Sequence, residues 1–167
     1  MKSERNSVKL ILLNASDELA LVLIDDEKVR GIDGKYGGSF WCMIGGKIES
    51  GETIWDAAER ELFEETGIMA KDVEFGPEVW FGSVDLLING VLTVVNQRFV
   101  VARTEVGAFD FSNLTENEKS TFQKIEWFSI DSLEAAKEPV YPASLLEHLP
   151  AVIAKNYPAN PVKIRMR

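Results

Sequence analysis

The feature that most constrains the fold is a helix whose acidic residues adjoin the face that it should bury. Thr53 followed by Asp56 forms a capping pattern at the helix start, and Gly67 occupies the place of a left-handed C-cap. The sequence therefore predicts a helix from about Ile54 to Thr66. At about 100° per residue, one arc of this helix collects the residues that should pack on the interior: Ile54, Ala57, Ala58 and Leu62.

Three glutamates extend that buried arc. Glu61, Glu64 and Glu65 lie three and four residues apart, so they share an arc of about 100° that overlaps the apolar one. Like charges at this spacing repel, and the negative end of the helix dipole makes them less favourable still. Charges turned toward an interior need partners, and clustered carboxylates are the ligands that Mg²⁺ or Mn²⁺ prefers. A solvated glutamate-rich face is the alternative that this pattern alone leaves open.

Strand-forming runs surround the helix. Residues 8–13 and 19–24 are rich in Leu, Ile and Val and are separated by a polar turn, which predicts a hairpin or near-hairpin. Residues 25–39 contain four glycines and are expected to form a flexible surface loop, and residues 40–44 a short strand. Asn89-Gly90 is a strong hairpin signal between two further strands.

The second half of the chain adds one more strand and two helical segments. Residues 109–119 form a predicted polar loop before a last strand at residues 122–128. A short helical piece at residues 131–137 and a terminal helix at residues 144–155 follow. This order predicts a single domain over residues 1–167 of the α/β (α+β) class, with a mixed β-sheet and helices packed on it.

Charge and cysteine content narrow the functional classes. The formal net charge is −9 and the pI about 4.7, which disfavours binding to long nucleic acid or to an anionic membrane. An acidic protein can still bind a phosphorylated small molecule when metal ions lie between the two. Cys42 is the single cysteine, no run approaches the ~20 apolar residues of a membrane span, and we expect a cytoplasmic protein.

The acidic helix lies within a longer motif. Gly46 is followed after five residues by Glu52, and after seven more by the run Arg-Glu-Leu-Phe-Glu-Glu-Thr-Gly-Ile at residues 60–68. This segment resembles the Nudix box, and every position that the family pattern specifies is met. The resemblance implies a mixed β-sheet sandwiched between helices, and a hydrolase that cleaves a diphosphate linkage in a nucleotide.

The resemblance also implies a metal site. Glu61, Glu64, Glu65 and the backbone carbonyl of Gly45 would ligate Mg²⁺ or Mn²⁺. A carboxylate would accept the proton of the attacking water, and the two candidates for this base are Glu61 and Glu118, an acid in the predicted loop.

Other residues of the motif would support the site. Arg60 would pair with a glutamate of the cluster and fix its orientation. Glu52 would brace the loop at the helix start, and Gly46 and Gly67 would permit tight backbone turns.

The substrate side is less defined by the sequence. Arg98 is a candidate phosphate ligand, and Trp41 and Phe81 are candidate walls for a base, with a surface ion pair and core packing as the respective alternatives. The expected substrate is a nucleoside diphosphate linked to another moiety, such as a nucleoside triphosphate, ADP-ribose or a nucleotide sugar. The competing functions are a non-catalytic nucleotide sensor and a purely structural or protein-binding domain. Many relatives form homodimers, which leaves a homodimer open here.

Overall fold

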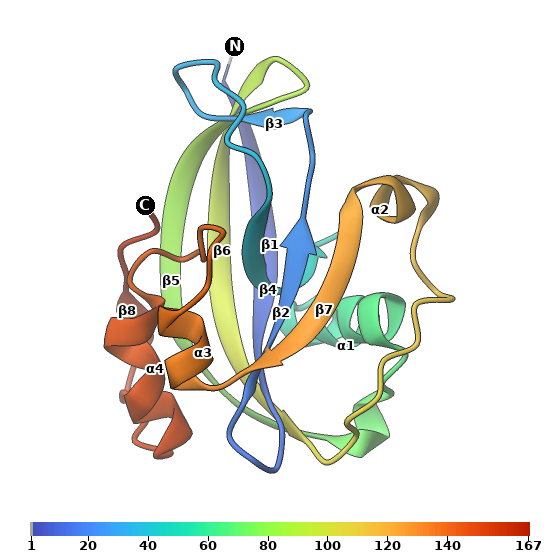
Figure 1. Cartoon of the computed structure of the whole chain (residues 1–167), viewed down its shortest axis with the longest axis vertical. Helices are drawn as coiled ribbons and strands as arrows, with labels where there is room; N and C mark the ends of the chain where they lie inside the picture. The colour runs from blue at the N-terminus through green and yellow to red at the C-terminus, as the bar shows by residue number, and fades with distance from the viewer. Residues whose placement is uncertain (1) are drawn as a thin grey trace.

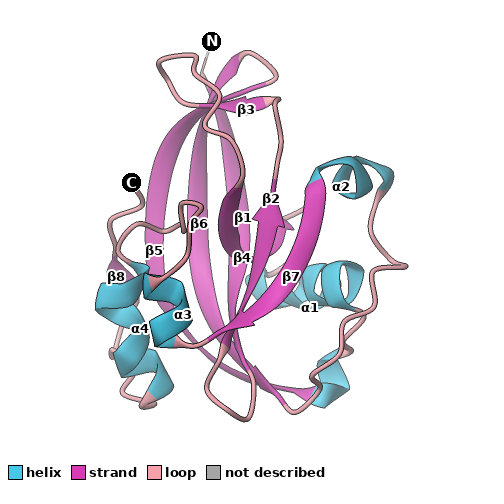
Figure 2. Cartoon of the chain, in the orientation of Figure 1, coloured by secondary structure: helices cyan, strands magenta, loops and turns pink. Residues whose placement is uncertain are grey.

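The computed structural model describes residues 2–167, and its centre is an eight-stranded mixed β-sheet (Figures 1 and 2). The strands are β1 (Ser3–Leu13), β2 (Leu19–Ile24), β3 (Val29–Arg30), β4 (Phe40–Lys47), β5 (Val73–Ile88), β6 (Val91–Thr104), β7 (Phe122–Phe128) and β8 (Val162–Lys163). Their order is β3-β5-β6-β1-β4-β2-β7, with β8 paired to β5. β1 runs parallel to β6 and antiparallel to β4, which places β1 near the middle of the sheet.

Helices pack on both faces of the sheet. Helix α1 (Ile54–Thr66) packs in one hydrophobic cluster, whereas α3 (Ile130–Glu134) and α4 (Leu145–Ile153) pack in the other. β1 contributes to both, because its alternate side chains point to opposite faces: Ile11 belongs to the cluster of α3 and α4, and Leu10 to that of α1. Figure 1 shows the α3–α4 pair at the left of the sheet and α1 at the right, behind β7. The predicted mixed sheet with packed helices is confirmed.

The local signals around α1 and the long hairpin are confirmed. Thr53 and Asp56 form the reciprocal capping box, and Gly67 ends α1 with φ of 74°. The turn at Asn89 and Gly90 has positive φ at both residues and joins β5 to β6. The sequence could predict these features because the residues that form them lie close together in the chain.

Three expectations need correction. The hairpin of β1 and β2 is correct only at its turn, where Leu13 pairs with Leu19, because β4 lies between the two strands in the sheet. The expected loop at residues 25–39 contains β3, which pairs with β5, and the expected loop at residues 109–119 contains the start of helix α2 (Glu116–Thr121). The first two differences arise because the strand partners lie far apart in the sequence, and the third because Thr115 and Glu118 form a capping box.

Across residues 2–167, the helices are all too short or too polar to cross a membrane.

Candidate active site

Three carboxylates from two helices meet at one end of α1. Oxygen atoms of Glu61, Glu64 and Glu118 all lie within 4.8 Å of one another. Glu61 and Glu64 come from α1, and Glu118 comes from α2, more than fifty residues later in the chain. Glu61 is buried, and the other two are half-buried. The structure therefore brings the loop acid to the same place as two acids of the motif.

Local hydrogen bonds explain why Glu118 lies there. In the capping box of α2, the backbone N–H of Thr115 donates to Oε2 of Glu118 at 2.8 Å. The preceding loop is tied to the end of α1, because the N–H of Asp110 donates to the carbonyl of Thr66 at 2.8 Å. Asp110 also lies against Gly67, where an added Cβ would be 2.7 Å from the Cβ of Asp110. The loop that leads to Glu118 is thus attached at the C-terminal cap of α1.

Arg60 is the cationic centre of the acidic cluster. Its Nε donates to Glu52 at 2.6 Å, its Nη1 to Glu61 at 2.8 Å and its Nη2 to the carbonyl of Lys47 at 2.8 Å. The hydrogen bond from Arg60 lowers the pKa of Glu52 to about 2. Glu52 also accepts from the N–H of Glu49, so it braces the loop before α1. These are the placements that the resemblance implied for Arg60 and Glu52.

Gly46 lies directly against the Glu61 carboxylate. A Cβ built on Gly46 would be 2.5 Å from Oε1 of Glu61 and 2.7 Å from its carboxyl carbon. Real side chains do not approach this closely, so any larger residue would displace the carboxylate. The glycine at this position is required by the close approach of Glu61.

Glu65 lies apart from the three-acid group. It is buried, and its Oε2 accepts a hydrogen bond from the N–H of Gly45 at 3.0 Å. Burial raises the pKa of Glu65 well above its ordinary value, with a smaller lowering by Lys9. The expected four-ligand set is thus divided: Glu61 and Glu64 stand with Glu118, while Glu65 and Gly45 are hydrogen-bonded to each other beside them.

The cluster has more negative charge than Arg60 offsets. Burial raises the pKa of Glu61 and of Glu64, and neighbouring carboxylates raise both further. Oε2 of Glu61 is buried and has no hydrogen-bond partner within residues 2–167. An unpaired buried carboxylate oxygen among three convergent carboxylates is the donor set of a hard divalent cation. The residues present fit Mg²⁺ or Mn²⁺.

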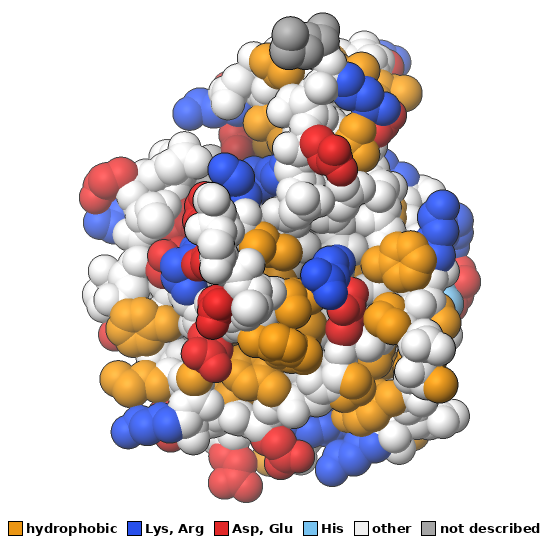
Figure 3. Space-filling model, turned by 180° about the vertical axis from the view of Figure 1, so that it is seen from behind, with side chains coloured by type: hydrophobic (Ala, Val, Ile, Leu, Met, Phe, Trp, Pro, Cys, Tyr) orange, Lys and Arg blue, Asp and Glu red, His pale blue; other side chains and the backbone are white. Residues whose placement is uncertain are grey.

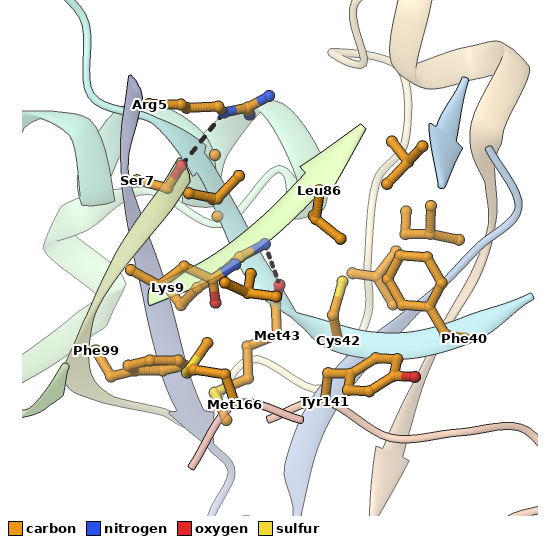
Figure 4. Close-up of a pocket in the computed structure, with 18 of the residues that line it drawn as sticks. Arg5, Ser7, Lys9, Phe40, Cys42, Met43, Leu86, Phe99, Tyr141 and Met166 are labelled. Atoms are coloured by element: carbon orange, nitrogen blue, oxygen red, sulfur yellow. Dashed lines mark hydrogen bonds between the residues drawn. The ribbon is translucent and has the colours of Figure 1, made fainter. Parts of the chain in front are cut away.

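A cavity of about 210 Å³ adjoins this acidic cleft (Figure 4). Arg5, Gly45 and Gly46 line both the cavity and the cleft, so the two are adjacent. Arg5, Ser7 and Lys9 alternate along β1, which turns all three toward the cavity. Aromatic and sulfur-containing side chains form much of the remaining wall, namely Phe40, Cys42, Met43, Phe99, Tyr141 and Met166.

The predicted substrate residues lie away from this cavity. Trp41 is buried in the core and donates to Glu138, and Arg98 forms two hydrogen bonds to Glu78 of 2.8 and 2.6 Å. Phe81 is exposed on β5 and lines neither the cavity nor the cleft. Sequence reasoning missed Lys9, although polar residues at alternate positions of an apolar strand were a usable signal.

The surface around α1 is mixed in character. Figure 3 views the molecule from behind and shows acidic and basic side chains interleaved around apolar ones on this face. Despite the net charge of −9, this face is not uniformly acidic. The buried acidic residues of α1 are Glu61 and Glu65.

Comparison with known proteins finds a family match over most of the chain. Residues 3–149 match the family model described as the NUDIX domain. The chain is 40% identical over 73 residues to Nudix hydrolase 6 of Arabidopsis thaliana, covering 43% of this chain and 24% of that protein. It is 43% identical over 51 residues to the oxidized purine nucleoside triphosphate hydrolase of Mus musculus, covering 30% of this chain and 33% of the mouse protein. The matched segments thus span a third or less of these two relatives.

A solved structure shares the whole fold. The crystal structure of a Caenorhabditis elegans Ap4A hydrolase binary complex superposes with a TM-score of 0.60, covering 90% of this chain and 98% of that one. The sequences are 18% identical, so this likeness concerns the fold.

Proposed function

Because the chain belongs to the Nudix hydrolase family, we propose that it hydrolyses a diphosphate linkage in a nucleoside diphosphate joined to another moiety, with a divalent metal ion bound at the acidic cleft. The observation that carries this proposal is the convergence of Glu61, Glu64 and Glu118 within 4.8 Å. The apolar cavity beside them offers a place for the organic part of such a substrate.

Glu61, Glu64 and Glu118 would hold Mg²⁺ or Mn²⁺, with the Gly45 carbonyl and Glu65 next to them as further candidate ligands. When bound, the ion supplies charge neutralisation of phosphate oxygens and a lowered pKa for bound water. Arg60 holds the carboxylate of Glu61 in place through its 2.8 Å hydrogen bond. Arg5, which lines both cavity and cleft, is placed to contact a phosphate that spans them.

In this proposal, one of the carboxylates accepts the proton of the attacking water. Glu118 is our first candidate for the group that accepts the proton of the attacking water. One of its oxygens is held by Thr115, and the carboxylate still reaches the other two acids. Glu61 is the alternative, because burial raises its pKa and so strengthens it as a base. Substituting each separately distinguishes them, since loss of the base flattens the acidic limb of the pH–rate profile.

The substrate classes to compare come from the chemistry of relatives. The mouse relative is named for oxidised purine nucleoside triphosphates, and the structural neighbour for Ap4A. Both compounds contain a nucleoside diphosphate unit. ADP-ribose and nucleotide sugars contain the same unit and belong in the same comparison.

The testing experiment measures phosphate and pyrophosphate release with excess Mg²⁺ from nucleoside triphosphates, oxidised nucleoside triphosphates, dinucleoside polyphosphates, ADP-ribose and nucleotide sugars. We expect turnover of at least one class, abolished by EDTA and lowered by Glu64→Gln by about 100-fold or more. The matched control is Glu59→Gln, an exposed acid on the same helix, which should retain wild-type turnover. Full activity of Glu64→Gln, or EDTA-resistant turnover, contradicts the proposed site.

A further inference from the structure

The cavity beside the acidic cleft contains an ammonium group with few partners. Lys9 reaches into it from β1, and the hydrogen bond found for Nζ within residues 2–167 goes to the carbonyl of Met43 at 3.3 Å. Figure 4 shows this bond inside the cavity. The ion pairs of the same residues do not include Lys9. Because an ammonium carries three N–H donors, Lys9 retains donors for a ligand.

The walls around Lys9 suit a flat ring better than a phosphate. Phe40, Phe99 and Tyr141 present aromatic groups, and Met43 and Met166 present thioethers. A phosphate bound against these apolar side chains would lose part of its hydration shell, which is unfavourable. A heterocycle would gain apolar contact on its faces and would need polar partners only at its edge.

The polar groups of the cavity are mainly donors. Besides Lys9, the side chains of Arg5 and Arg167 can only donate, whereas Ser7 and Gln97 can donate or accept. The one carboxylate in the wall, Glu65, is buried and already accepts from the N–H of Gly45. A ring edge that carries a carbonyl oxygen therefore matches the cavity better than one that carries an amino group.

We propose that Lys9 is a specificity-determining residue that donates a hydrogen bond to a carbonyl oxygen of the substrate's base. The cavity then favours 6-oxopurines over 6-aminopurines and 4-oxopyrimidines over 4-aminopyrimidines. This inference rests on the proposed function for its kinetic readout and goes beyond it by defining the class of base.

Two substrate pairs test this, since inosine triphosphate and ATP differ at position 6, and UTP and CTP at position 4. We expect the wild-type kcat/KM to favour the oxo member of each pair by about tenfold, the ratio for one charge-assisted hydrogen bond. In Lys9→Met that ratio should fall to about one, and Lys9→Arg, which keeps the donors, should restore part of it. The control Lys71→Met replaces an exposed lysine on the distant 3₁₀ turn Ala70–Asp72 and should leave the ratio unchanged.

Binding separates failure of this inference from failure of the proposed function. Calorimetric titration of inosine monophosphate and AMP in the presence of Mg²⁺ reports the same discrimination without turnover. A protein that hydrolyses nothing but binds inosine monophosphate more tightly than AMP, with this preference lost in Lys9→Met, contradicts the hydrolase and supports the role of Lys9. Preference for the amino compounds, equal or undetectable binding of both, or an unchanged ratio in a folded Lys9→Met protein overturns the role of Lys9.

Discussion

At the scale of single residues, Gly46 is fitted closely to the acid beside it. Since a Cβ at this position would lie 2.5 Å from Oε1 of Glu61, Gly46→Ala must move the carboxylate or the strand. A displacement of about 1 Å at a reacting centre lowers the rate by about 100-fold, and we expect a loss of this size in kcat. Steady-state kinetics would measure it. Gly37→Ala is the control, because a Cβ on Gly37 meets open space; an equal loss in both variants would contradict the steric cause.

The interaction of Glu52 with Arg60 makes the stability of the fold depend on pH. Arg60 lowers its pKa from 4.5 to about 2, so Glu52 stabilises the fold above pH 4.5, and this contribution is lost as the pH falls toward 2. We expect Glu52→Gln to unfold at lower urea concentration than wild type at pH 7, with the difference shrinking below pH 4.5. Urea titrations at pH 7, 4 and 2.5 would show this trend, and a difference that grows in acid would contradict it.

At the scale of secondary-structure elements, the two ends of α1 have separate roles. Gly67→Ala places a side chain at φ of 74° and against Asp110, whose loop leads to Glu118. We expect it to lower the free energy of unfolding by about 1 kcal/mol or more and also to lower kcat. Thr53→Ala removes the N-terminal cap at a similar cost of about 1 kcal/mol, but it should leave kcat unchanged. Equal kcat in the two variants would show that the cap does not position Glu118.

The same elements show what the sequence could reveal about the fold. The bounds of α1 and the turn at Asn89 and Gly90 were predictable, because caps and tight turns depend on neighbouring residues. The place of β4 between β1 and β2 was not, because strand order depends on contacts between residues far apart in the chain. β3 was missed for the same reason, since its two residues form a strand only through β5.

The candidate site was likewise predictable from the sequence only in part. Glu61, Glu64 and Glu65 were predicted to share one arc from helical spacing, and Arg60 stands next to them in the motif. The division between Glu65, held by Gly45, and the group of Glu118 needed the structure, because it depends on how α1 packs against β4. The two aromatic candidates were poor guides to the cavity, because Trp41 fills the core and Phe81 is exposed on β5.

At the scale of the whole molecule, the acidic cleft should couple metal binding to stability. Burial raises the pKa of Glu61, Glu64 and Glu65, so the folded chain binds protons more strongly than the unfolded chain. Without metal, these groups favour folding below pH 4.5 and lose that contribution as the pH rises through their folded pKa values. A divalent ion binds the ionised form, so its stabilising effect should increase with pH.

This coupling can be measured by thermal unfolding with Mg²⁺ or EDTA at pH 6 and pH 8. We expect Mg²⁺ to raise the Tm at both values and to raise it more at pH 8. Glu61→Gln should remove most of the Mg²⁺-dependent shift, whereas Glu59→Gln should retain it. A shift that is smaller at pH 8, or that persists in Glu61→Gln, would mean that the ion binds elsewhere.

The alternation of side chains along β1 affects how the sequence of this protein can evolve. Arg5, Ser7 and Lys9 face the cavity, while Val8 and Leu10, interleaved with them, pack in the cluster of α1. Replacing a residue of the first set alters what the cavity accepts without removing a contact that supports the acidic helix. Selection can therefore act on ligand preference without disturbing the packing of the acidic helix, although both are encoded in one short strand.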